Sequence, residues 1–343
     1  LILSGVTIAT LTGDNGLLNR ASEAKENTQI ASEDELRNLT ILEATTHLEE
    51  YEYEDSSGAK ITIPAKCAVS KVEGENIIQN GLVIIDVNGN EWVWIEVPKE
   101  ITKQANTDSE IEIALEEYTK NVITDKNGYE DIWYAYDRGN VITSDLEGLT
   151  ETQKNLNNGC GLTYNEYNEK KSLMLNSIKL NGGFYVGRYE VGYEINQGES
   201  TRNYGTDYTT NHPTEQTPAI KPNLYPYNWV RCVQAEELAE KLAVENKTSS
   251  LLFGIQWDLI IKFINAKNAK TLEELTLDSS RWANYTKSKL QITNKYSKYS
   301  EDNGAIYNNW IEPTKLENES SILTTGGTIN TMVLNIYDLA GNM

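Results

Sequence analysis

Residues 82–97 constrain the fold more than any other segment, because they have the pattern of a β-hairpin. Two apolar runs flank the dipeptide Asn88-Gly89, and Asn-Gly tolerates the left-handed backbone that a tight hairpin turn requires. The alternation that a strand imposes places Trp92 and Trp94 on the same face of the second run. We therefore expect two antiparallel strands joined by a short turn in this part of the chain.

A second β-rich run covers residues 181–193 and reads N-G-G-F-Y-V-G-R-Y-E-V-G-Y. Its aromatic and β-branched side chains predict a strand, and its internal glycines mark a bulge or a close approach of backbone. The last residues, 335–343, read N-I-Y-D-L-A-G-N-M.

Together these segments resemble the formylglycine-generating-enzyme-type (sulfatase-modifying-factor) domain, a variant of the C-type-lectin fold. In that family a strand F-Y-x-G-x-Y-E-V begins the domain body, and x-Y-D-x-x-G-N-x-W-E-W lies near its end. A family strand V-W-I-x-V also matches the second half of the 82–97 hairpin. The resemblance implies an α+β domain over residues 59–343, with an insertion at about 99–165. The second motif stops just before W-E-W, so we expect this domain to be incomplete at its C-terminus.

The N-terminal run, residues 1–11, is apolar and uncharged but shorter than the ~20 residues that cross a bilayer. It is either a buried core element or the end of a longer hydrophobic helix. From Leu17 to about Tyr51 helix formers dominate with a thin apolar stripe, which is typical of a solvated stalk helix. The region resembles the type IV prepilins of Gram-positive, clostridial-type anaerobes. This implies the end of a membrane-anchoring helix at 1–12 and an amphipathic stalk helix at 13–55.

The stalk is followed by an acidic run at 49–55, which we expect to be solvated surface, and by Ser56-Ser57-Gly58, which we expect to be a linker. Helices are predicted over 108–121, over 166–180, over 233–244 and in a segment that ends near 265. Trp257 in the last of these is expected to anchor the core. The polar stretches 194–222 and 265–327 are expected to carry little regular structure.

Composition narrows the classes of function. The 343 residues carry a formal net charge of −21, which disfavours nucleic acid and anionic lipid surfaces as partners. The sequence has two histidines, which are too few for most histidine-based metal sites and leave few candidates for a catalytic triad. The three cysteines, Cys67, Cys160 and Cys232, form neither a disulfide framework nor a zinc motif. The start of a predicted helix can lower the pKa of the Cys232 thiol, but simple packing explains this residue as well.

No paired acid and base, phosphate-binding loop or nucleophile elbow occurs in the sequence, so we assign no catalytic residue. The strongest chemical indication is calcium, which the family binds at the Y-D-x-x-G-N turn. Carried over by position, Asp338 would supply a side-chain oxygen, and Gly341 and Met343 would supply backbone oxygens. Calcium takes 6–8 oxygen ligands of these kinds. The alternative is that Asp338 only caps a turn.

Three functions remain open. The first is a cell-surface display protein, membrane-anchored through its N-terminal helix, whose extracellular head binds a protein or glycan ligand. Related heads carry C-terminal residues diversified by retroelements. The second is a formylglycine-generating oxidase that acts on a cysteine of a protein substrate. The third is a structural minor pilin, with other pilins as partners. The prepilin-like stem favours the first and third, and we expect the first.

Overall fold

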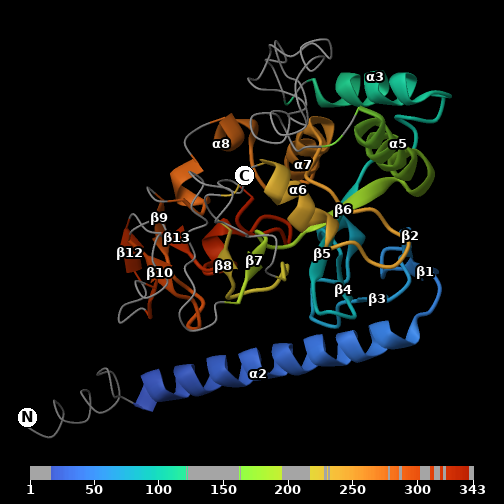
Figure 1. The fold of residues 1–343 in the computed structure, drawn as a ribbon. Helices are drawn as coiled ribbons and strands as arrows, with labels where there is room; N and C mark the ends of the chain where they lie inside the picture. Colours follow the sequence, from blue (N-terminus) through green and yellow to red (C-terminus); the bar gives the residue numbers. More distant parts are fainter. Residues whose placement is uncertain are drawn as a thin grey trace, which may run out of the picture.

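The computed structural model describes most of the chain between Leu17 and Leu339. The described residues are 17–120, 122, 162, 164–194, 217–227, 230, 232–276, 279–285, 288–301, 310–312, 317–319 and 322–339. Helices and antiparallel strands occur in both halves of this set (Figure 1). The expected α+β class is therefore confirmed.

A four-stranded antiparallel sheet forms the centre of the fold, with the strand order β3-β4-β5-β6. Its strands are β3 (Cys67–Val69), β4 (Val83–Asp86), β5 (Glu91–Glu96) and β6 (Gly183–Gly187). The predicted hairpin is confirmed, because Val83 pairs with Val93 across a turn in which Gly89 has a φ of +78°. The second predicted strand also belongs to this sheet, since β6 pairs with β5 along its whole length, although it ends at Gly187.

The two faces of the sheet bury different side chains. Val93 and Ile95 face the main core, which α3 (Asp108–Thr119), α5 (Tyr164–Asn181) and α7 (Gly254–Ala266) cover. Trp94 faces a smaller core, and Trp92 packs against that same core. The predicted alternation of this strand is therefore confirmed.

The helices expected from periodicity are confirmed, although α6 (Cys232–Glu240) ends before the expected residue 244. Helix α3 lies in the expected insertion but contributes Ile111 and Leu115 to the main core. The first part of that segment thus belongs to the body of the fold, and most of the remainder lies outside the described residues. Trp257 is half-buried and packs against the main core, as expected.

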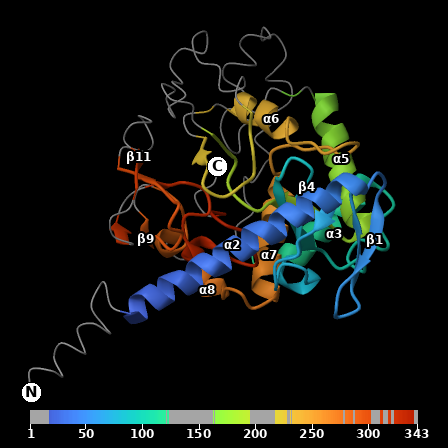
Figure 2. The same ribbon diagram turned by 90° about the horizontal axis from the view of Figure 1, so that it is seen from below.

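Helix α2 (Leu17–Thr46) crosses the molecule beneath the central sheet, as Figure 2 shows. Its described side chains before Gln29 are exposed, in agreement with a solvated stalk. Its second half is different, because Thr40 and Ala44 are fully buried and the helix contacts β3 and β4. The expectation of a solvated stalk is therefore wrong for this half. Its apolar stripe is thin, and polar contacts with the sheet add to the apolar packing that holds the helix.

The stalk also ends earlier than expected. Residues 51–63 form a hairpin of β1 (Tyr51–Glu54) and β2 (Lys60–Ile63), so the expected linker at Ser56-Ser57-Gly58 is a hairpin turn. Asp55 in the acidic run is buried, and its carboxylate accepts hydrogen bonds from the backbone amides of Ser57 and Ile78. A carboxylate with several amide donors stabilises a turn, which explains why this acidic residue is not on the solvated surface.

The region after α7 contains more regular structure than its polar composition predicts. Short strands form two small sheets in this region. A further small sheet lies earlier in the chain, where residues just after β6 pair with residues just before α6. These strands are β7 (Gly192–Tyr193) with β8 (Tyr225–Pro226), β9 (Lys289–Gln291) with β12 (Glu317–Glu319), and β10 (Tyr299–Ser300) between β11 (Trp310–Ile311) and β13 (Ile322–Leu323). The expectation of little regular structure over 265–327 is therefore wrong.

Short helical turns complete the described elements: α8 (Leu272–Thr276), η1 (Ile78–Asn80), η4 (Ser279–Arg281) and η6 (Ile329–Thr331). Among the described helices, none combines the length and the apolar character needed to cross a membrane. Residues 1–16, including the apolar run, lie outside the described part of the chain.

Candidate functional site

The segment around Asp338 forms a tight turn that packs against the end of β6. Val333 and Ile336 exchange two backbone hydrogen bonds, and Leu334 and Asn335 between them both have positive φ angles, as in tight hairpin turns. The amide of Tyr337 then donates to the carbonyl of Arg188 at 2.7 Å. The two motifs that carry the family resemblance therefore lie side by side, although about 150 positions separate them in the chain.

The Asp338 carboxyl is only 1% exposed. Its Oδ2 accepts a hydrogen bond from the amide of Gly326 at 2.7 Å. Burial raises the pKa of Asp338 to about 6, against the lowering effect of the Gly326 amide and the Thr331 hydroxyl. The Gly326 contact agrees with the turn-capping interpretation of Asp338. Its role as a calcium ligand stays a prediction, and Gly341 and Met343 lie outside the described residues.

The structure adds Glu190, which the sequence analysis did not single out, to the surroundings of Asp338. Glu190 is 8% exposed, and its Oε2 atom has no hydrogen-bond partner among the described residues. Burial raises the pKa of Glu190 well above its usual range, the charge of Asp338 raises it further, and a hydrogen bond from Asn284 opposes both. In the sequence, Glu190 could have been identified by its position in the E-V part of the motif F-Y-x-G-x-Y-E-V.

A second set of buried charges lies at the same end of β6 and joins four segments of the chain. Arg37 of α2 and Arg188 each contact the same two carboxylates, those of Glu75 and Glu91. Arg37 lies 2.9 Å from Glu75 and 2.7 Å from Glu91, and Arg188 lies 2.7 Å and 2.8 Å from them. Each glutamate therefore touches two guanidinium groups, and the four charges cancel.

The pKa values in this cluster reflect the pairing. Burial alone would raise the pKa of Glu75, but the charges of Arg188 and Arg37 and a hydrogen bond from Ser70 lower it to about 2. Burial raises the pKa of Glu91, which is only 3% exposed, in spite of the same two arginines. Arg188 also lies 5.5 Å from the centres of the Tyr189 and Tyr337 rings. The cluster joins α2 to the sheet.

The two described cysteines are poor candidates for nucleophiles. Burial raises the pKa of the Cys67 thiol to about 12 and that of Cys232 to about 11. Since the thiolate is the reactive form, both sulfurs are protonated at neutral pH. Cys232 begins α6 as expected, but burial outweighs any lowering of its pKa by the helix start. Cys160 lies outside the described residues.

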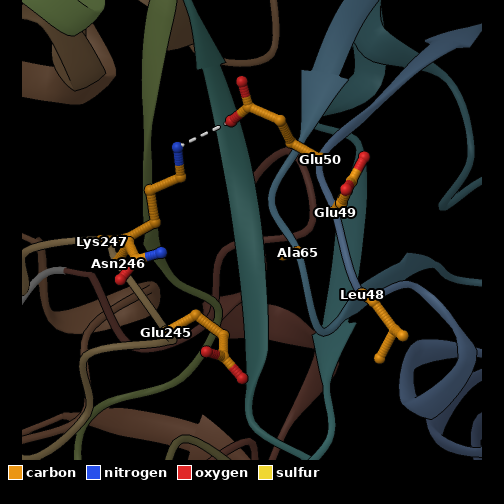
Figure 3. A pocket seen from close by; sticks show the side chains of 7 residues that line it. All are labelled: Leu48, Glu49, Glu50, Ala65, Glu245, Asn246 and Lys247. Carbon is orange, nitrogen blue, oxygen red and sulfur yellow. Dashed lines mark hydrogen bonds and ion pairs between the residues drawn. The ribbon is translucent and has the colours of Figure 1, made fainter.

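Two recesses are found on the described surface. Figure 3 shows the first, where Lys247 reaches Glu50 at 3.0 Å and the carboxylates of Glu49 and Glu245 stand nearby. It has a cavity volume of about 360 Å³, and Leu48, Ala65 and Asn246 complete its lining. The second, about 810 Å³, lies between residues 24–36 of α2 and Val72-Glu73. Most of their lining side chains are exposed, so neither buries a ligand as enclosed binding sites do.

In the described part of the chain, no group of three or more His, Cys, Asp or Glu side chains is placed to hold a metal ion. Comparison of the chain with protein-family models, with curated proteins and with solved structures finds no match. The class that the fold defines is therefore the broad one, an α+β protein with a long N-terminal helix packed on an antiparallel sheet.

Proposed function

We propose that this protein is a cell-surface display protein with a pilin-like stem and a formylglycine-generating-enzyme-type, C-type-lectin-like head. The head binds an extracellular protein or glycan and carries out no chemistry. The N-terminal helix anchors the protein in the membrane, and other pilins are further partners of the stem. Calcium held at the Asp338 turn has a structural role in this proposal.

The way α2 is joined to the rest of the molecule carries the proposal. A display protein needs a stem that extends away from the head and is still held firmly to it. The first half of α2 is solvated, and the second half is held by the ion pairs of Arg37 with Glu75 and Glu91 at 2.9 and 2.7 Å. Lys71 adds an ion pair with Glu43 and a backbone hydrogen bond to Thr40. Such contacts make the stem and the head one unit.

Two observations support the type of head. The end of β6 and the Asp338 turn lie together, as motifs of one domain body should, through the hydrogen bond between Tyr337 and Arg188. The high pKa values of Cys67 and Cys232 make both thiols poor nucleophiles, so neither of them supplies the head with an oxidase's reactive cysteine.

The test is to apply the labelled 343-residue chain to printed arrays of glycans and extracellular proteins. In parallel, the unlabelled chain is incubated with a cysteine-containing peptide in air. We expect saturable binding to a defined subset of the array and no conversion of the peptide cysteine to an aldehyde. Conversion of the peptide would overturn the proposal in favour of the oxidase. If the chain does neither, the structural minor pilin becomes the better interpretation.

The calcium part of the proposal has its own measurement. Melting of the chain is followed with added calcium and with a chelator. An ion that binds only the folded form raises the melting temperature by mass action, so calcium should raise it for the natural chain. Asp338→Ala should remove most of that response. An equal response in both proteins would show that calcium binds elsewhere.

A further inference from the structure

One face of the small β7–β8 sheet carries a cluster of four aromatic rings. Tyr193 lies directly opposite Tyr225 in this sheet, so both side chains leave it on the same side. Tyr227 follows two positions later, and its amide continues the pairing by donating to the carbonyl of Val191 at 3.2 Å, which places it on that side as well. The ring centres of Tyr193 and Tyr227 are 4.6 Å apart. Trp310 of β11 completes the cluster, with its ring centre 4.9 Å from that of Tyr225.

The cluster has a buried base and a partly exposed edge. Tyr193 is 1% exposed and Trp310 is 8% exposed, whereas Tyr225 and Tyr227 are both partly exposed. Packing therefore fixes the two inner rings, and the two outer rings bring the cluster to the surface. Rigid tyrosine and tryptophan rings supply a large contact area at a low cost in conformational entropy, which is why binding surfaces use them.

Two polar atoms of this cluster have no hydrogen-bond partner among the described residues, the hydroxyl of Tyr227 and Nε1 of Trp310. Both atoms are buried, and buried tyrosine and tryptophan side chains usually find a partner. Burial, with a smaller effect of Tyr193, raises the pKa of Tyr227, so its hydroxyl keeps its proton at neutral pH and is available to donate. The indole N–H is a donor only. A bound molecule with acceptor oxygens would satisfy both donors without displacing a described hydrogen bond.

We propose that the cluster of Tyr193, Tyr225, Tyr227 and Trp310 is a binding subsite for one neutral sugar residue of a glycan. This inference rests on the proposed function, in which the head binds an extracellular protein or glycan, and it chooses the glycan. The apolar C–H face of the sugar ring packs on the aromatic rings, whose faces carry partial negative charge. The oxygens of the sugar accept hydrogen bonds from the Tyr227 hydroxyl and the Trp310 indole.

The size and charge of the site favour a sugar over a peptide. The paired part of β7 and β8 has two residues in each strand, and Tyr225 and Tyr227 are about 7 Å apart along the chain direction. This length suits a single sugar ring. A proline-rich peptide, which also binds to aromatic clusters, is an extended helix that is recognised over several residues and needs a longer groove. The formal net charge of −21 disfavours acidic sugars, so the sugar is neutral.

The experiment measures binding of the labelled 343-residue chain to printed neutral oligosaccharides that end in glucose, galactose, mannose, fucose or N-acetylglucosamine. Sialylated oligosaccharides, a proline decamer and extracellular proteins are printed beside them. We expect saturable binding to some of the neutral oligosaccharides and at least tenfold weaker binding in both Tyr227→Phe and Trp310→Phe. The first change removes only the hydroxyl, and the second removes the N–H while keeping an aromatic ring. Tyr296→Phe is the matched control, because Tyr296 is 57% exposed and lies outside the cluster. It should bind with unchanged affinity.

A melting measurement separates a binding role from a structural one. Because the Tyr227 hydroxyl has no partner among the described residues, Tyr227→Phe should keep the melting temperature of the free protein while its glycan affinity falls. A lower melting temperature with unchanged glycan affinity would show that the hydroxyl is a structural group, and would overturn the proposal. Tyr225→Ala covers the case in which Trp310→Phe does not fold. It removes a partly exposed ring on which the sugar packs, so binding should be lost, and unchanged affinity in the folded variant would overturn the site.

The outcomes separate this subsite from the proposed function. Glycan binding with equal affinity in the natural chain, Tyr227→Phe and Trp310→Phe would overturn the subsite and retain the binding head. Binding only to proteins, to the proline decamer or to sialylated oligosaccharides would overturn the neutral sugar and again retain the head. Absence of binding to every printed molecule would overturn both.

Discussion

Two pairs of buried carboxyl groups lie at the end of strand β6, and they are compensated in opposite ways. Glu75 and Glu91 each touch the guanidinium groups of Arg37 and Arg188. Glu190 and Asp338 have no basic partner among the described residues, and the pKa of each is raised. The first pair is held by arginines whose charges balance it, whereas the raised pKa values of the second pair favour the neutral carboxyl form. Buried carboxyl groups in this protein are thus paired with arginines in one place and lack a described basic partner in the other.

The two environments lie close together because residues 188–190 turn away from the sheet just after β6 ends at Gly187. Arg188 donates its backbone amide to Glu91 and joins the first pair, and Glu190 joins the second. Tyr189 lies between them in the chain, and its ring stacks on Tyr337 with centres 5.0 Å apart. Adjacent strand-end residues thus serve two separate sites.

The largest expected effect is the loss of Arg188. Arg188→Met leaves Glu75 and Glu91 buried with only Arg37 as a partner, and breaking a buried pair in this way costs about 3–5 kcal/mol. Denaturant titration should show this loss in the free energy of unfolding. Lys60→Met, which removes an exposed ion pair with Glu52, is the control and should cost less than about 1 kcal/mol. Similar losses of unfolding free energy in both variants would contradict the structural role of the buried pairs between Arg188 and the two glutamates.

Acid should weaken the paired cluster. Because the pKa of Glu75 is lowered from 4.5 to about 2, its contribution is fully present above pH 4.5 and is lost as the pH falls from 4.5 toward 2. The shift corresponds to about 3 kcal/mol of unfolding free energy at most. Free energies of unfolding measured across this range should fall, and the fall should be smaller in Glu75→Gln. Equal pH profiles for the two proteins would show that Glu75 is not the titrating group.

Arg37 tests the attachment of the stem. Its side chain is partly exposed, so Arg37→Met should cost less than Arg188→Met, about 1–3 kcal/mol. Hydrogen exchange should rise in the second half of α2, around Thr40 and Ala44, because these residues lose their attachment to the sheet. Arg20→Met, in the solvated first half of α2, provides the control. Unchanged exchange at Thr40 in the Arg37 variant would mean that apolar contacts alone hold the helix.

The smallest expected effect concerns Glu190 in the absence of metal. Burial and the charge of Asp338 raise the pKa of Glu190 well above its usual range, which favours the protonated carboxyl in chelator-containing buffer. A glutamine has nearly the same shape and charge as this protonated form. Glu190→Gln should therefore change the free energy of unfolding by less than about 1 kcal/mol, whereas Glu75→Gln should cost more. A large loss in chelator-treated Glu190→Gln would show that the ionised carboxylate already has a partner.

Much of the local structure follows from the sequence. The Asn88-Gly89 turn, the alternating residues around Trp92 and Trp94, and the periodicity of α3, α5 and α7 are short-range signals, and the structure confirms each of them. The errors concern segments whose state depends on distant partners. From the sequence, Asp55 is expected on the surface. In the structure it is buried, because the backbone amide of Ile78, 23 positions later, donates a hydrogen bond to its carboxylate. The short strands after α7 form because other strands pair with them, despite their polar composition.

The candidate site was predictable only in part. Asp338 was identified because a motif surrounds it, and its burial and Gly326 contact came from the fold. Glu190 is marked only by its position in the E-V part of the strand motif, and the Arg37 cluster carries no local signal. The charged partners in that cluster are 38 positions apart for Arg37 and Glu75 and 113 (188 − 75) for Arg188 and Glu75. Side-chain spacing determines which residues share a strand face or a helix turn, so the sequence by itself determined the central hairpin, strand β6 and the longer helices. Only the tertiary structure decided which buried charges meet, because a charge is compensated through space by whichever segment the packing brings within a few ångströms.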